Sequence, residues 1–462
     1  MNVLIMREYW ITVRRLSPEV INDRALNGVE LAYNGSREDL DPYVPADHRP
    51  LESNTSSFGA LAHLLKASLG SGVLAMPLAF KNAGLLVGSV GTMLVGFICA
   101  HAIHVLVKTS QKLCIEAKKP CLGYADTCDL VFQHGPKPVR RFAPIARELA
   151  DWALAVTHLG ACCVYVVVVA ESFKQVSDFY GGPSWSVTVY CAWTLVILLP
   201  LTQITKLKYL VPFSAIANFV WLGSICISIY YCLRDPPPFS TRNMATSISG
   251  IPNFISTSLF AMEGIGVVMP IENEMTKPHH FLGCPGVLNI AMTAVVMLYG
   301  FVGFAGYLNF GEEVRGSLTL NLPKDEVLAQ TAKVLVACVM ILSFALIFYV
   351  PVDVVWRKLQ DRIPARGHRW GIAGLRLIGC LMTVGLAAAI PKLELFMELV
   401  GAVCLSVMGL LLPSVVETVW LWDKDLGPGR WILYKNCVIG IFSIIALVSG
   451  VAYSIIGMLE NL

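Results

Sequence analysis

Long runs of apolar residues, repeated along most of the chain, constrain the fold more than any other feature of the sequence. Eleven such runs follow one another from residue 58 onwards. An α-helix rises about 1.5 Å per residue, so roughly 20 residues cross a hydrocarbon core about 30 Å thick. Each run reaches or approaches that length, at residues 58–80, 83–107, 150–172, 185–202, 209–232, 253–273, 286–309, 329–350, 371–390, 395–415 and 432–457. The sequence therefore predicts an all-α polytopic membrane protein with about 11 transmembrane helices.

The composition argues against several other classes of protein. Of 462 residues, 55% are hydrophobic and only 15% are charged, whereas soluble domains are about a quarter charged. A net charge of +3 without a long basic run argues against a nucleic-acid partner. Most of the 14 cysteines lie inside apolar runs, where they pack as small apolar residues, so we expect no metal site. No motif of a nucleophile elbow, a P-loop or a zinc protease is present, so we expect neither an enzyme nor a bound cofactor.

Residues 1–57 precede the first apolar run and are rich in Asp, Arg, Pro and Ser. Such a segment cannot bury enough apolar surface to fold alone, so we expect a disordered tail. With the N-terminus in the cytoplasm, twenty Lys and Arg residues fall in cytoplasmic loops and eight in outer loops. Because cytoplasmic loops carry the excess of basic residues, the sequence predicts a cytoplasmic tail followed by a transmembrane domain over residues 58–458.

Two of the apolar runs are interrupted by glycine in the middle and by proline beyond. In the first run glycine occupies positions 70 and 72, and in the sixth run it occupies positions 264 and 266. Paired interruptions at corresponding places in two halves indicate an inverted-repeat transporter whose substrate binds near the midplane of the bilayer. The two repeats then cover about residues 58–232 and 253–415, and the run at 432–457 is an extra helix.

Unwinding a helix in the membrane frees backbone groups, each of which costs several kcal/mol in lipid unless it lines a polar cavity. A zwitterion suits such a cavity. Its carboxylate accepts hydrogen bonds from freed amides at a half-helix N-terminus, and its ammonium donates to freed carbonyls. The alternative is that these glycines only allow helices to pack closely, as small residues do in membrane bundles.

The residues around the two interruptions resemble a known family. The segments are HLLKASLGSGVLAMPLAFKNAG at 63–84, FAMEGIGVVMPIENEM at 260–275, GYLNFGEEVRGSLTLNLP at 306–323, FYVPVDV at 348–354 and AAIPKLEL at 388–395. In this order they resemble the proton-coupled amino acid transporter family, a branch of the amino acid/auxin permease group with a LeuT-like fold. The resemblance extends over roughly residues 58–455.

The resemblance implies a LeuT-like inverted repeat of five plus five helices with one extra helix. It also implies symport of a small neutral amino acid, of the glycine, alanine or proline type, with a proton as the coupling ion. The chain departs from the family pattern at Glu398, where the family has a small polar residue, so substrate preference does not carry over directly. The implied substrate-binding residues are Gly70, Ser71, Gly72, Gly264, Ile265 and Gly266, and the implied proton-coupling residues are His63 and Glu263.

The chemistry of His63 and Glu263 fits that role. A histidine titrates near pH 6.5 in water, so modest changes in its surroundings let it load and release protons at physiological pH. A charged side chain at the bilayer centre costs at least about 2.5 kcal/mol on insertion scales, which favours a carboxyl group that is protonated until water reaches it. The alternatives are a neutral histidine bonded inside the bundle and a glutamate paired with backbone amides or a basic side chain.

Other charged residues have weaker interpretations. Glu272 and Glu274 end the sixth run, and we expect them to form a cytoplasmic gate with Lys or Arg. Lys66 either snorkels towards the membrane surface or pairs inside the bundle.

A competing function is an amino acid-sensing membrane receptor that signals through cytoplasmic partners at the tail. Either protein would lie in the plasma membrane or in a lysosomal or endosomal membrane, with the lipid bilayer, amino acids and protons as its partners.

Overall fold

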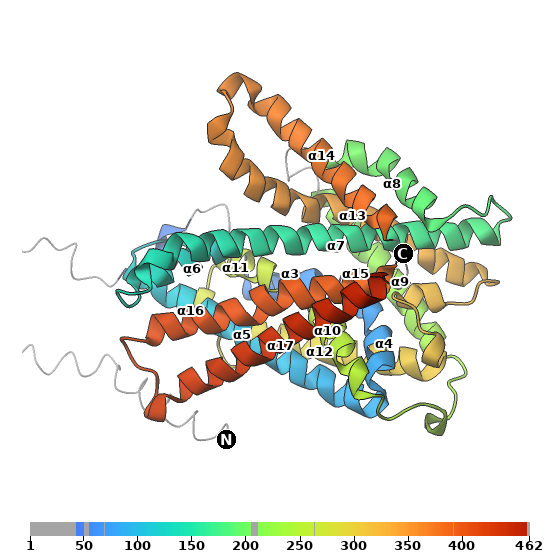
Figure 1. Cartoon of the computed structure of the whole chain (residues 1–462), viewed down its shortest axis with the longest axis horizontal. Coiled ribbons are helices and arrows are strands. Elements are labelled where there is room, and N and C mark those ends of the chain that lie inside the picture. The colour runs from blue at the N-terminus through green and yellow to red at the C-terminus, as the bar shows by residue number, and fades with distance from the viewer. Residues whose placement is uncertain are drawn as a thin grey trace, which may run out of the picture. The chain divides into compact units, whose positions relative to one another are not determined.

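The computed structural model describes residues 43–49, 55–68, 70–204, 211–262, 264–390 and 392–459. Within these ranges the chain is helical and carries no strand, apart from one isolated bridge between Thr55 and Met275. Figure 1 shows the helices as a bundle whose long members run side by side. The predicted all-α class is confirmed.

The helices correspond in order to the eleven predicted runs. In the described part of the chain, nine helical segments are long and apolar enough to span a membrane, one further span is a bent pair of helices, and α8 is shorter. The bounds are α3 Ser57–Ser68 with α4 Gly72–Ala83, α5 Leu85–Glu116, α7 Ala143–Phe179, α8 Val187–Thr202, α9 Val211–Leu233, α10 Ile251–Ala261 with α11 Ile265–Asn273, α12 Val287–Phe310, α13 Val327–Leu359, α14 His368–Ala389, α15 Leu393–Val400 with a π-helix Gly401–Leu411 and α16 Leu412–Leu421, and α17 Trp431–Leu459.

The central helix of the bundle is α7, which is 37 residues long. Ten consecutive residues, Ala161–Ala170, are buried. Since a helix that is apolar and covered on all sides belongs to the core, this stretch of α7 is part of the core. The helix α7 packs against α13, α6 (Tyr124–His134) and α8, while α4 packs against α10 and α12.

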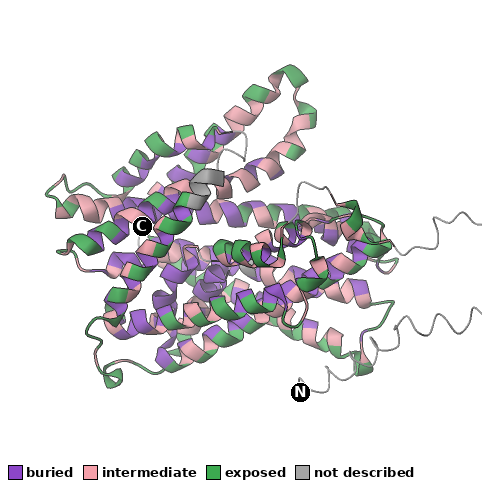
Figure 2. Ribbon diagram, turned by 180° about the vertical axis from the view of Figure 1, so that it is seen from behind, coloured by how far each residue is buried: buried purple, intermediate pink, exposed green. Residues whose placement is uncertain are grey.

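The outer helices present apolar side chains to their surroundings. On α17, Val438, Ile441, Ile445 and Val448 are all exposed, at a spacing that puts them on one helix face. Figure 2 shows the same pattern, with exposed residues along the outer ribbons and buried residues towards the middle. A continuous apolar face of this kind is suited to lipid, as expected of a multi-pass membrane protein.

Two elements differ from the predicted pattern. The basic loop at residues 108–147 contains a helix, α6 (Tyr124–His134), which packs against α7 and α16. The helix α7 also extends beyond its apolar run at both ends. Near its N-terminal end polar residues have partners, since Arg147 pairs with Asp126 at 2.9 Å and Asp151 pairs with Lys358 of α13 at 3.3 Å.

The chain just before α3 also has defined contacts. Arg49 donates to the backbone oxygens of Pro120 at 3.0 Å and Glu272 at 2.9 Å, and its guanidinium lies 3.4 Å from the Glu272 carboxylate. Gln111 of α5 donates to the same carboxylate at 2.9 Å. Glu272 thus pairs with an arginine, whereas the predicted cytoplasmic gate of Glu272 and Glu274 stays a prediction. Most of the predicted tail, residues 1–42 and 50–54, lies outside the described residues, so its disorder stays a prediction.

Candidate functional site

The first break lies where the glycine cluster predicts it. Helix α3 ends at Ser68 and α4 begins at Gly72, and the two axes differ by 53°. The hydroxyl of Tyr299, from α12, donates a hydrogen bond to the freed carbonyl of Ser68. The backbone N–H of Gly70 donates to the same carbonyl at 2.9 Å. A freed backbone group is therefore satisfied by a neighbouring helix rather than by lipid.

The second break separates α10 from α11. Helix α10 ends at Ala261, and α11 begins at Ile265 with Gly264 as its N-cap. Neither α4 nor α11 has a side-chain hydrogen bond at its cap. The first N–H groups of a helix have no partner within the helix, so both half-helices start with donors that a bound anion can use.

The two breaks pack directly on each other. A Cβ atom added to Gly72 would lie 2.4 Å from the carbonyl oxygen of Ala261, which no side chain can tolerate. A Cβ atom on Gly264 would instead meet the hydroxyl of Ser68 at 3.5 Å, an ordinary contact. Close packing of the two helices therefore explains the glycine at position 72. At Gly72 the alternative prediction, that glycine allows helices to pack closely, applies together with the break in the helix.

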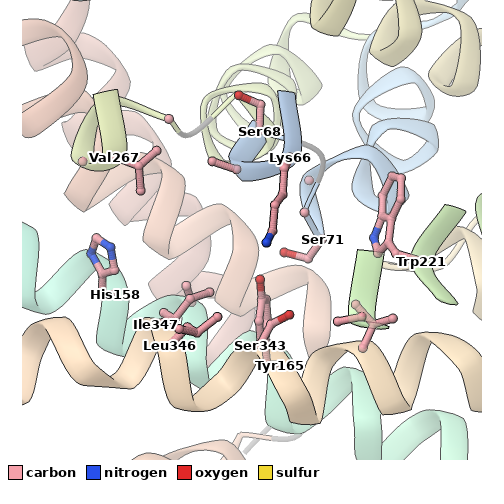
Figure 3. Close-up of a pocket in the computed structure, with 18 of the residues that line it drawn as sticks. Lys66, Ser68, Ser71, His158, Tyr165, Trp221, Val267, Ser343, Leu346 and Ile347 are labelled. Carbon is pink, nitrogen blue, oxygen red and sulfur yellow. The ribbon is translucent and has the colours of Figure 1, made fainter. Parts of the chain in front are cut away.

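A cavity of about 420 Å³ lies at the two breaks (Figure 3). Its apolar wall comes largely from α13, which contributes Met340, Leu346 and Ile347. Exposed residues of α3, among them His63, Lys66 and Ala67, border it, so the cavity opens along that helix. The polar and titratable side chains of the lining are His63, Lys66, Ser68, Ser71, His158, Tyr165, Asn218, Trp221 and Ser343.

Most of the residues predicted for the site meet at this cavity. Its lining includes His63, Gly70, Ser71, Gly72, Gly264 and Gly266. Ile265 is not part of that lining; its buried side chain borders a separate small cavity beside Cys99 and Ile103 of α5. Glu263 lies outside the described residues, so its predicted role in proton coupling stays a prediction.

The cavity also contains residues that the two breaks do not reveal. His158 and Tyr165 come from α7, and Trp221 comes from α9. The indole N–H of Trp221 is buried and has no hydrogen-bond partner in the described part of the chain. One signal does point to His158, since an ionisable residue in the middle of an apolar run is a candidate functional residue.

A second cavity, of about 620 Å³, lies at the C-terminal end of α7, and no residue of either break lines it. Its lining mixes acidic and basic side chains, among them Glu171, Arg315 and Glu394. Glu394 accepts a hydrogen bond from the backbone N–H of Gly316 at 2.9 Å, so part of this charge stabilises the loop after α12. Within the described ranges, no three metal-binding side chains come together in a way that could hold an ion.

Comparison with known proteins identifies the family. Residues 53–456 match the family described as transmembrane amino acid transporter protein, which is most of the chain. The chain belongs to this family. It is 40% identical, over 89% of its length and 86% of the relative's, to the Drosophila melanogaster protein named "Proton-coupled amino acid transporter-like protein pathetic". It is 25% identical to the Caenorhabditis elegans "Probable amino acid transporter skat-1", over 87% of this chain and 90% of that protein.

The fold of this transporter is also similar to that of a solved structure. "Inward facing conformation of Mhp1" superposes with a TM-score of 0.56 over 94% of this chain and 95% of the other, at 13% sequence identity. At such low identity the likeness concerns the fold alone. It confirms the predicted LeuT-like class for this member of the amino acid transporter family.

Proposed function

We propose that the chain is a symporter that moves a small neutral amino acid together with a proton across a membrane. The observation that carries this proposal is the cavity at which both broken helices meet. Two half-helix N-termini, α4 and α11, start at that cavity without side-chain caps. A carboxylate is the group that such donors favour, and every amino acid has one.

The walls of the cavity favour a small side chain. Gly72 lies against Ala261, so the backbones of the two broken helices approach closely on one side. On the other side, Met340 and Ile347 of α13 form an apolar surface that suits a short side chain and repels a charged one. Glycine, alanine and proline are the substrates that we propose on this basis.

Proton coupling is supported by the titratable residues of the cavity and by the name of the Drosophila relative. His63 is exposed and lines the cavity on α3. We propose His63 and Glu263 as proton-coupling residues. Protons and amino acids are then the ligands, with no enzymatic step and no bound cofactor.

The excess of basic residues in alternate loops supports an N-terminus in the cytoplasm. In that orientation the start of α3 is at the cytoplasmic side, and the cavity that opens along α3 faces the cytoplasm. The membrane that we propose is the plasma membrane or a lysosomal or endosomal membrane.

The test is current recording from cells that express the full chain. Alanine, glycine and proline are applied at an outside pH of about 5.5 and of about 7.5, on either side of the ordinary pKa of a histidine. Inward currents that saturate with substrate and grow at the lower pH are the expected result. Binding of alanine without current or tracer uptake would overturn the transporter proposal in favour of an amino acid sensor.

A further inference from the structure

One titratable side chain at the cavity, His158, takes no part in the function proposed above. It lies on α7, which has no break, and only 8% of its surface is exposed. Figure 3 shows its ring at the side of the cavity, below Val267. A Cβ atom added to Gly266 would lie 3.2 Å from the ring Cε1 atom and 3.8 Å from Nε2. His158 therefore adjoins the second break directly.

One hydrogen bond determines which ring nitrogen of His158 carries hydrogen. Nδ1 lies 2.8 Å from the backbone carbonyl oxygen of Leu154, one turn earlier on α7. A carbonyl oxygen only accepts, so Nδ1 is the donor, and in the neutral ring Nε2 keeps its lone pair. The described residues offer Nε2 no hydrogen-bond partner. A buried base with a vacant lone pair thus borders a cavity that is open to water.

The charged groups near His158 are few. The other titratable residues that line the same cavity are His63 and Lys66 on α3 and Tyr165 on α7, whereas the described residues of α9, α10, α11 and α13 contribute only neutral side chains to it. Two turns away on α7, Asp151 is paired with Lys358 of α13. On α15, Glu398 is not part of the cavity lining.

The charges at the cavity link the binding of a proton to the binding of the substrate. A cation on His158 would lie beside the mostly neutral side chains of the cavity, where burial disfavours the charged form. The carboxylate of an amino acid that binds next to the ring offsets this cost. Proton binding and amino acid binding then strengthen each other by the same factor, as linkage requires.

We propose that Nε2 of His158 accepts the proton that crosses with the amino acid, and that the resulting N–H donates to the amino acid carboxylate. The proton comes from water in the cavity and converts the neutral ring to a cation. Its release on the other side of the membrane restores the neutral ring. This inference rests on the proposed function, and it adds a coupling residue on α7 to those proposed on the first and sixth spans.

Two substitutions separate the functions of the ring nitrogens. In His158→Asn the amide nitrogen replaces Nδ1 and can keep the bond to Leu154, whereas in His158→Gln it replaces Nε2. Neither side chain titrates. His63→Gln is the matched comparison, because it removes the other histidine of the cavity.

Each purified full-length variant is reconstituted into liposomes, and two quantities are measured with labelled alanine. The first is accumulation driven by a gradient of about two pH units, which can concentrate a substrate about a hundredfold when one proton moves with it. The second is exchange of alanine at equal pH, which needs no net proton movement. We expect both His158 variants to lose accumulation while exchange persists. The alanine affinity of His158→Asn weakens by about fivefold through the lost hydrogen bond, whereas His158→Gln keeps a donor in the place of Nε2.

Accumulation by both His158 variants at the wild-type level would overturn the inference. If exchange is lost as well, the Kd of alanine for each variant in detergent is measured against pH. If the Kd of alanine no longer depends on pH in the variant, the inference is supported. If the Kd depends on pH as in the wild type, or if alanine does not bind at any pH, His158 has a structural role and the inference is overturned. A wild-type chain that exchanges alanine without accumulating it would instead overturn the proton-coupled function itself.

Discussion

The buried pair of Arg49 and Glu272 makes a quantitative prediction about stability. Only 8% of the Arg49 side chain and 3% of the Glu272 side chain are exposed. Replacing Arg49 by Ala removes two hydrogen bonds to backbone oxygens, at 3.0 and 2.9 Å, and leaves a buried carboxylate. Breaking a buried pair costs about 3 to 5 kcal/mol, and we expect about 3 kcal/mol because Gln111 still donates to Glu272.

The prediction is measured by thermal unfolding of the protein in detergent, at one fixed scan rate because unfolding of such proteins is often irreversible. At about 2 °C per kcal/mol for a large domain, Arg49→Ala lowers the midpoint by about 6 °C. Glu272→Gln removes the charge that Arg49 compensates. The free energy of unfolding of the double variant therefore falls by about 2 kcal/mol less than the sum of the two single losses. A loss below about 1 °C for Arg49→Ala, or strict additivity in the double variant, would refute the reasoning.

Three further predictions follow from the same structure. Gly72→Ala places a methyl group 2.4 Å from the Ala261 oxygen and costs about 1 to 3 kcal/mol of stability, with loss of alanine exchange. Gly264→Ala, with its nearest atom at 3.5 Å, leaves stability unchanged, and equal losses of stability in the two variants would contradict the packing argument. Trp221→Phe removes a buried N–H that has no partner among the described residues, so stability is unchanged, and alanine binding weakens by up to about tenfold if the substrate accepts from that N–H. A midpoint that drops by several degrees would show instead that the indole N–H is needed for folding. At the start of α13, the Tyr231 hydroxyl and Arg234 hold the pKa of Glu326 below its ordinary value of 4.5. A carboxyl group whose pKa is lower in the folded protein stabilises the fold at pH values above its ordinary pKa, and this stability is lost as the pH falls through the pKa of the folded state. Glu326→Gln therefore makes the melting midpoint depend less on pH on the acid side.

Much of the fold is predictable because its strongest constraint is local. A run of roughly 20 apolar residues must become a helix in lipid, and glycine followed by proline weakens that helix at a known place. The breaks at α3 to α4 and at α10 to α11 therefore fall on the predicted glycines. The helix α6 was not predicted, because its residues are mixed in polarity and its stability comes from packing on α7 and α16.

The site is less predictable because it is assembled across helices. Glycine marks the residues at a break, but no local sequence pattern shows which face of an unbroken helix borders the cavity. His158 and Trp221 lie on such unbroken helices and line the cavity. Arg49 shows the same limit, since a polar segment gives no sign that its arginine will be buried against the end of α11.

Burial differs sharply between the two halves of the first span, and this difference bears on how the cavity can close. In α4, every residue from Gly72 to Phe80 is buried against neighbouring helices. In α3, the buried residues are Ala60, Leu64 and Ser68, and the face that carries His63 and Lys66 is exposed at the cavity. Moving α4 would open a packed core, whereas moving α3 would cover polar side chains that now meet water. We therefore expect the cavity to close by a movement of α3 rather than of α4.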